Sequence, residues 1–187
     1  MRISGGSELG AAAALALLVM APVAAQAARH HAAPPHPAIA AERIGGAGPW
    51  SAYLYKGGSG PVCYLAGAPE KTEPAKFRRR PSSLTVTHRP KENVFNVVNF
   101  DAGTTLKPGS DASVDIDGTK FDLFTKSDGA WSRTSDTDKA IVEAMVKGRT
   151  ARFSGTAAKG PTVIDSYSLD GFTQTLALID KACGVRR

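Results

Sequence analysis

The chain contains only two cysteines, and their positions constrain its fold more than any other feature. Cys63 stands early in the chain and Cys183 follows 120 residues later, close to the C-terminal end. Cys183 also ends a segment whose apolar residues recur at helical spacing. The residues that share this helical face are Phe172, Leu176, Ile179 and Cys183. If the two thiols pair, the bond closes most of the chain into one loop; the alternative is two unpaired buried thiols.

The N-terminal segment favours the disulfide. Residues 1–27 are organised like a secretory signal peptide, with a weakly basic start, an apolar run at 11–25 and small residues before a cleavage site. The alternative is a membrane anchor, but the apolar run is shorter than the roughly 20 residues that a spanning helix needs. Export leads to an oxidising compartment, where a bond between Cys63 and Cys183 is favoured. We therefore expect a periplasmic or secreted protein with no transmembrane segment after cleavage.

Residues 28–48 are predicted to be a disordered linker. They are rich in histidine, proline and alanine, and such a composition offers little to bury. His30, His31 and His36 could bind a divalent metal weakly, because neutral imidazole is a good ligand. No further ligands stand at a fixed spacing, so a solvated tail is the favoured interpretation. We predict neither a metal site nor a cofactor.

Residues 49–187 are predicted to form a single, mainly β domain. Short strand-like stretches alternate with glycine-containing turns, which favours an antiparallel β-sandwich; two helices are expected late in the chain. A β-rich α+β arrangement is the alternative. The predicted strands are 50–55, 62–65, 84–88, 94–100, 114–116, 121–124, 130–133, 149–156 and 163–168, and the predicted helices are 138–147 and 172–183. Residues 94–100 are apolar at most positions, which is typical of a central strand covered on both sides.

Signals for catalysis are sparse in this domain. Its one histidine is His88, and no nucleophile or orienting carboxylate is specified for it. An exposed or capping role is therefore the favoured interpretation of His88. Asp111, Asp115 and Asp117 do not fit a calcium loop, because the position that requires a bidentate glutamate is occupied by Phe124. We predict a protein that is not an enzyme, with an envelope hydrolase as the less favoured alternative.

The densest charge feature is a proline-bounded basic loop. Lys76, Arg78, Arg79 and Arg80 form a candidate site for phosphates, sulfates or acidic sugars, because guanidinium groups form paired hydrogen bonds to such anions. A solvated loop that only keeps the protein soluble is the favoured interpretation. The net charge of +6 favours polyanions in general. An exported protein meets no chromosomal DNA, so the expected partner is an envelope or host-surface polyanion such as lipopolysaccharide, and not a nucleic acid.

Several segments between Gly48 and Cys183 carry a family resemblance. They are Trp50-Ser-Ala-Tyr53, Val62-Cys-Tyr64, the run from Lys120 to Trp131, Val142-Glu-Ala-Met145, Ser154-Gly-Thr156, and the run from Tyr167 to Cys183. These segments resemble the invasion-associated locus B family, small exported proteins of Gram-negative bacteria. The resemblance implies a non-enzymatic envelope or secreted β-sandwich linked to host-cell invasion or envelope stress, with Cys63 and Cys183 as a matching pair. It implies no catalytic or ligand-binding residue.

Overall fold

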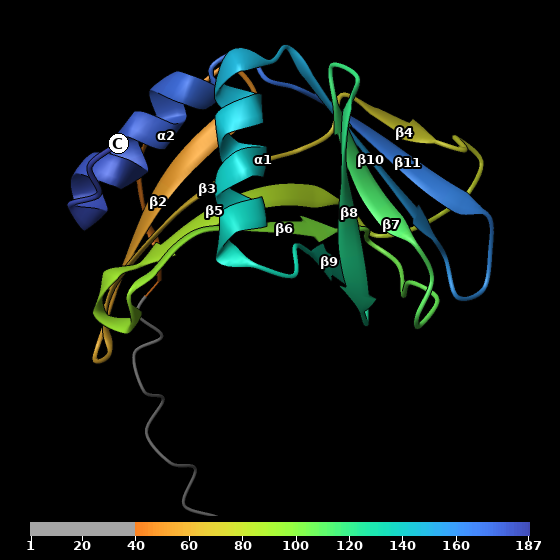
Figure 1. Ribbon diagram of the computed structural model, residues 1–187, viewed down its shortest axis with the longest axis horizontal. Coiled ribbons are helices and arrows are strands. Elements are labelled where there is room, and N and C mark those ends of the chain that lie inside the picture. The colour runs from red at the N-terminus through yellow and green to blue at the C-terminus, as the bar shows by residue number, and fades with distance from the viewer. Residues whose placement is uncertain (1–39) are drawn as a thin grey trace, which may run out of the picture. The chain divides into compact units, whose positions relative to one another are not determined.

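The computed structural model describes residues 40–187, which form an antiparallel β-sheet of 11 strands and two α-helices (Figure 1). The order of the strands in the sheet is β1-β2-β3-β5-β6-β9-β8-β7-β10-β11-β4. The first half contains β1 (Glu42–Ala47), β2 (Trp50–Gly57), β3 (Gly60–Gly67), β5 (Ser83–Arg89), β6 (Val94–Asp101) and β9 (Gly129–Trp131). The second half contains β7 (Ala112–Ile116), β10 (Thr150–Thr156), β11 (Thr162–Ser168) and β4 (Lys71–Glu73). β8 (Thr119–Lys126) joins the halves, since it pairs with both β9 and β7.

The two halves face each other across an aromatic core. Phe100 on β6 stacks on Phe153 on β10, with ring centroids 5.0 Å apart, and meets the ring of Tyr167 on β11 edge-on. All three side chains are almost completely buried, as expected for inward positions of two packed sheets. The predicted antiparallel β-sandwich with two late helices is confirmed.

The helix α2 (Phe172–Cys183) lies against β1, β2 and β3 and is held there by a disulfide bond. Cys63 and Cys183 are joined, with their Cα atoms 6.0 Å apart, which confirms the predicted pair. The predicted apolar face of α2 is buried, and Phe172 packs edge-on against Trp50 of β2. Gly171 precedes the helix as its N-cap residue, and its φ of 79° is in the left-handed region. A side chain there would also collide with the backbone of Ala47, so glycine is required where β1 and α2 meet.

The helix α1 (Ser135–Lys147) and a short 3₁₀ helix, η1 (Pro90–Glu92), complete the fold. The Thr134 side chain caps the start of α1 by accepting a hydrogen bond from the Thr137 N–H. α1 lies beside β6, where the buried Asp138 carboxylate accepts a hydrogen bond of 3.0 Å from the Val98 N–H. Val146, near the end of this helix, is exposed.

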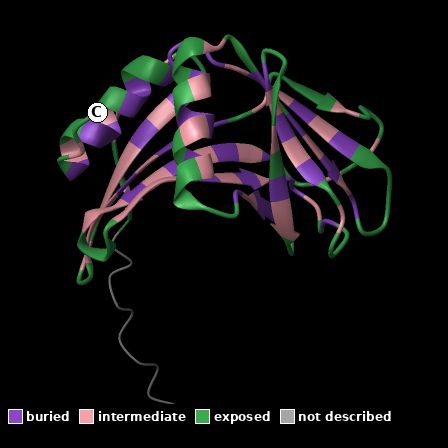
Figure 2. Ribbon diagram, in the orientation of Figure 1, coloured by how far each residue is buried: buried purple, intermediate pink, exposed green. Residues whose placement is uncertain are grey.

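Among residues 40–187, only one face of the first half of the sheet is covered by other elements. Its strands alternate between buried and partly exposed residues (Figure 2), and α1, α2 and the second half all lie on the side of the buried ones. The expectation that strand 94–100 is covered on both sides is therefore wrong: Val98 and Phe100 are buried, whereas Val97 and Asn99 on the opposite face are partly exposed.

The strand β1 corrects the predicted boundary between linker and domain. It lies inside the segment 28–48 that was expected to be disordered, and it pairs with β2 along its length. The glycines of β1 are more typical of a loop than of a strand. The strand is held by α2, because Gly45 lies against Leu178 and the Ala47 N–H donates a 3.0 Å hydrogen bond to the Thr175 hydroxyl. The short edge strand β4 was also not predicted. The proposed signal peptide and the part of the linker before residue 40 lie outside the described residues.

Asp138 leads to a prediction about the dependence of stability on pH. Burial raises the pKa of its carboxyl, against hydrogen bonds from Val98 and Ser132 that lower it. A carboxyl whose pKa is raised in the folded state destabilises the fold when it ionises. The stability therefore falls as the pH rises from the pKa of the unfolded state through that of the folded state. Asp138→Asn removes the charge and keeps an oxygen for the Val98 N–H. We expect the free energy of unfolding of Asp138→Asn, minus that of the wild type, to increase between pH 4 and pH 7 in urea titrations.

Asp138→Ala is the matched control, because it removes the charge and the acceptor together. It leaves the buried Val98 N–H unpaired, which costs about 1–3 kcal/mol. A difference between Asp138→Asn and the wild type that stays constant with pH would show that this carboxyl does not titrate as described.

Candidate functional site

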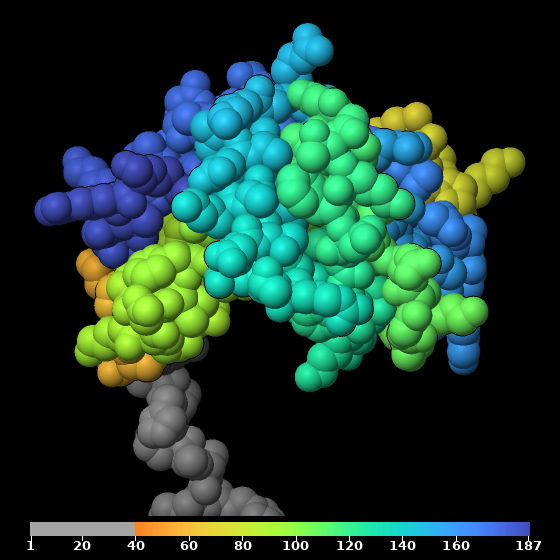
Figure 3. Space-filling model, in the orientation of Figure 1, coloured from red at the N-terminus to blue at the C-terminus, as the bar shows by residue number. Residues whose placement is uncertain are grey.

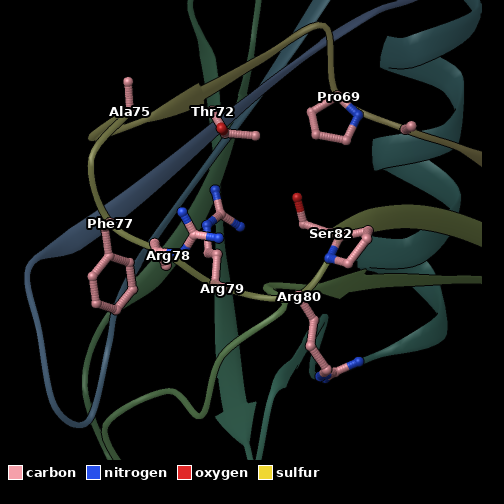
Figure 4. Close-up of a pocket in the computed structure, with 10 residues that line it drawn as sticks. Pro69, Thr72, Ala75, Phe77, Arg78, Arg79, Arg80 and Ser82 are labelled. Atoms are coloured by element: carbon pink, nitrogen blue, oxygen red, sulfur yellow. The ribbon is translucent and has the colours of Figure 1, made fainter.

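The basic loop between β4 and β5 borders a hollow of about 420 Å³ (Figure 4). The residues that line it are Ala68, Pro69, Thr72, Ala75, Phe77, Arg78, Arg79, Arg80, Pro81 and Ser82. Three of the four residues predicted to bind anions are among them; Lys76 is not. The structure therefore places the three arginines around one hollow, but their side chains have different surroundings.

Arg79 is a structural residue, which corrects its prediction as part of an anion site. Its guanidinium forms a two-pronged ion pair with Asp165 of β11, and one nitrogen also donates a 2.6 Å hydrogen bond to the Ala102 carbonyl. The side chains are only 6% and 0% exposed. The hydrogen bonds to Asp165 raise the pKa of Arg79 against the effect of burial, so the guanidinium stays charged and occupied. The sequence signal was Asp165, which stands at an inward position between Val163 and Tyr167.

Arg80 is exposed but already paired. Its guanidinium lies 2.5 Å from a carboxylate oxygen of Asp128 and 3.6 Å from one of Asp101. Lys76 and Arg78 are exposed, and neither takes part in an ion pair within residues 40–187. Of the four predicted residues, Lys76 and Arg78 are thus the two whose charge is available to a ligand.

Two buried hydroxyls add a polar side to this region. Ser82 lines the hollow, and its hydroxyl makes no hydrogen bond of standard geometry with the described residues; nor does the hydroxyl of Tyr167. Burial, with a further contribution from Asp165, raises the pKa of Tyr167 far above its usual value, although Ser82 and Arg79 oppose the shift. Buried polar groups are normally paired. The Ser82 hydroxyl is close enough to that of Tyr167 to lower its pKa, and both oxygens are buried, so Ser82 offers no exposed group to a molecule in the hollow.

His88 is buried, which corrects the expectation of an exposed or capping role. Its Nδ1 accepts a 3.0 Å hydrogen bond from the Asn96 N–H, so its Nε2–H donates to the Asp180 carboxylate, also at 3.0 Å. Asp180 is bound in turn by Arg187; burial opposes its ionisation, but the hydrogen bonds from His88 and Arg187 lower its pKa. Both ring nitrogens are occupied and the side chain is 0% exposed, so this imidazole cannot reach a substrate. It helps to hold α2 beside the disulfide.

Neither a metal-binding cluster nor a membrane-spanning helix is found in residues 40–187. In that range, no group of three or more histidine, cysteine, aspartate or glutamate side chains is arranged to hold a metal ion. None of the helices there has the length and apolar character required to span a membrane. His30, His31 and His36 lie outside the described residues.

Comparison with known proteins gives a family and a related fold. A family model described as invasion associated locus B (IalB) protein matches residues 50–180. The crystal structure of invasion associated protein B from Bartonella henselae is similar, with a TM-score of 0.53 and 17% sequence identity. The match covers 76% of this chain and 97% of that chain, and it shows a shared fold. No curated protein sequence matches.

Proposed function

We propose, because this chain belongs to the invasion associated locus B family, that it is an exported, non-enzymatic interaction protein of the cell envelope. Its specific role would lie in host-cell invasion or in tolerance of envelope stress. The observation that carries the proposal is the disulfide that fixes α2 to β3, since such a bond persists outside the reducing cytosol. The burial of His88 also supports a binding role over that of an envelope hydrolase.

The experiment combines location with phenotype. The protein should be recovered from the periplasm or the medium with Cys63 and Cys183 oxidised, and a deletion strain should lose adhesion to host cells or tolerance of envelope stress. Complementation with the full chain should restore the phenotype, whereas a form without residues 2–27 should not. A cytosolic protein with free thiols, or substrate turnover by the purified protein, would refute the proposal.

The hollow beside the basic loop favours a second, more specific function, which is binding of an anionic envelope polymer such as lipopolysaccharide. The supporting observation is that Arg78 and Lys76 are exposed without ion-pair partners among the described residues, and that Arg78 lines the hollow. A guanidinium suits a phosphate or sulfate group, to which it donates paired, charge-assisted hydrogen bonds. Arg79 would not contact this ligand but would hold the loop in place.

This proposal predicts which arginine affects binding. Arg78→Ala should weaken binding to lipopolysaccharide about tenfold, because a charge-assisted hydrogen bond is lost. Arg78→Lys should weaken it less, since the charge remains without the planar fork. Arg80→Ala is the matched control and should have little effect, because its charge is already neutralised by Asp128. Titrations at two salt concentrations measure the affinity, which should fall as ionic strength rises. Equal affinity of all three variants and the wild type would show that the loop is only a solvated connection between β4 and β5.

A further inference from the structure

The uncovered face of the first half of the sheet is a second candidate surface, which we call the outer face. It consists of the outward residues of β2, β3, β5, β6, β9 and β8, on the side opposite α1, α2 and the second half of the sheet. The strands arch, and in the space-filling view the molecule is hollowed below the arch, between the segment around η1 and the turn from β8 to β9 (Figure 3). The outward residues here are only partly exposed.

The strand register orders the side chains of this face into two rows. The first row is Arg43, Tyr53, Tyr64, Thr87 and Val97. The second row is Ser51, Ala66, Thr85, Asn99, Trp131 and Phe124. Aromatic residues thus stand at both ends of the face, and small, uncharged residues stand between them.

Each end carries one stacked pair of rings. Tyr53 and Tyr64 are 5.0 Å apart between centroids and nearly parallel, at 16°; Phe124 and Trp131 are 5.8 Å apart at 29°. In both pairs the outer ring covers one side of the inner ring. The other sides of Tyr64 and Trp131 are not covered by these pairs. Three strand spacings, about 14 Å, separate the strands β3 and β9 that carry them.

The strip between the two inner rings is polar and uncharged. It presents the hydroxyls of Thr85 and Thr87 and the side-chain amide of Asn99, groups that can both donate and accept hydrogen bonds. The Asn99 amide nitrogen itself is buried, so the hydroxyls of Thr85 and Thr87 are the donors that this strip offers to a ligand.

The positive charges of the face lie at its two ends. Arg43 stands opposite Tyr53 in the strand register, and its guanidinium donates a 3.3 Å hydrogen bond from Nε to the Ser51 hydroxyl. The guanidinium of Arg133 lies over the ring of Phe124, 5.7 Å from its centroid. Within residues 40–187 neither arginine forms an ion pair, so the charge of each is available to an anionic group.

We propose that the outer face binds an acidic oligosaccharide chain that lies across the strands. Apolar faces of its sugar rings pack against Tyr64 and Trp131, which offer flat surfaces with low conformational entropy. Its hydroxyls bond to Thr85, Thr87 and Asn99, and its acidic groups pair with Arg43 and Arg133. The proposal rests on the interaction function above and names the ligand class, at a site separate from the hollow of the basic loop.

The same observations argue against two other polymers. Single-stranded nucleic acid carries a phosphate at every residue and is held in grooves that are positively charged along their length, whereas the strip here is neutral. An extended peptide usually binds by adding a strand to a sheet edge, and the outer face is not an edge. Both polymers serve as competing ligands in the test.

Trp131 provides a direct measurement of binding. It is one of two tryptophans, and the other, Trp50, is buried with its Nε1–H donating to the Ser168 carbonyl at 3.0 Å. A ligand on the outer face should therefore change the fluorescence of Trp131 while Trp50 stays constant. We would titrate the oxidised full-length mature protein with oligogalacturonates, sialylated oligosaccharides and heparin fragments of defined length. Methyl-esterified oligogalacturonate, polyglutamate and oligodeoxythymidylate are the comparison ligands.

The expected result is binding of at least one acidic oligosaccharide with a lower affinity for its uncharged ester. Tyr64→Ala and Trp131→Ala should each weaken binding about tenfold or more, measured by calorimetry, because each removes one stacking surface. Tyr64→Phe should bind like the wild type. Arg43→Gln with Arg133→Gln should abolish the preference for the acid over the ester. Arg149→Ala removes an exposed arginine that belongs to neither candidate site, and it should have no effect.

Three outcomes would overturn the proposal. They are absence of binding to every acidic oligosaccharide, wild-type affinity of Tyr64→Ala and Trp131→Ala, and equal or tighter binding of polyglutamate or oligodeoxythymidylate. Thermal unfolding of each variant checks that the domain is folded. If no acidic oligosaccharide binds the outer face but the deletion strain still shows its phenotype, the proposed interaction function stands without this ligand. If the deletion strain shows no phenotype, the binding measurements on the purified protein are unaffected. The two failures are therefore distinguishable.

Discussion

Replacement of both Cys63 and Cys183 by alanine is expected to lower the free energy of unfolding by about 4–5 kcal/mol. The bond closes a loop of 120 residues, and a cross-link over such a length removes much of the conformational entropy of the unfolded chain. This amount is comparable to the net stability of many domains, about 5–15 kcal/mol. Urea unfolding of the oxidised wild type and of the double variant measures the difference.

Reduction provides the control for this prediction. A thiol reductant should destabilise the wild type to nearly the level of the double variant, and should leave the double variant unchanged. The loss of stability should be largest at α2, whose other polar contacts with the sheet include the hydrogen bonds from His88 to Asp180, from Ala47 to Thr175 and from Arg187 to Asn96. Equal urea midpoints for the wild type and the double variant would show that packing alone secures α2.

The sequence was sufficient to predict elements whose pattern is local. Turn glycines and alternating apolar residues located most of the strands, and the spacing of Phe172, Leu176 and Ile179 located α2. β1 was missed because its stability is not local: Gly45 and Gly46 have no strand preference, and the strand exists because β2 and α2 pack against it. The three-residue strand β4 was missed because it depends on its pairing with β11.

The candidate sites show the same limit more strongly. Three consecutive arginines look alike in a sequence, yet Arg79 is buried against Asp165, Arg80 is paired at the surface and Arg78 is exposed. The partner of Arg79 lies 86 residues away, so only the fold brings them together. The outer face could not be predicted either, because its two rows of residues come from strands whose order in the sheet does not follow the chain.

The ion pair between Arg79 and Asp165 gives the second large prediction. Arg79→Ala should lower the free energy of unfolding by about 3–5 kcal/mol, because it leaves the Asp165 carboxylate, with 0% exposure, as an unpaired buried charge. The Ala102 carbonyl would lose its donor as well. Urea unfolding at neutral pH measures the loss.

The neighbouring arginines are matched controls, since they have the same side chain in the same loop. Arg78→Ala should change stability by no more than about 0.5 kcal/mol, as is usual for exposed residues. Arg80→Ala should cost about 0–1 kcal/mol, because exposed ion pairs contribute little. The double variant Arg79→Met with Asp165→Leu should recover much of the loss, since it removes both buried charges together. A small effect of Arg79→Ala, similar to that of Arg78→Ala, would contradict a structural role for Arg79 and would return it to the anion site that the sequence predicted.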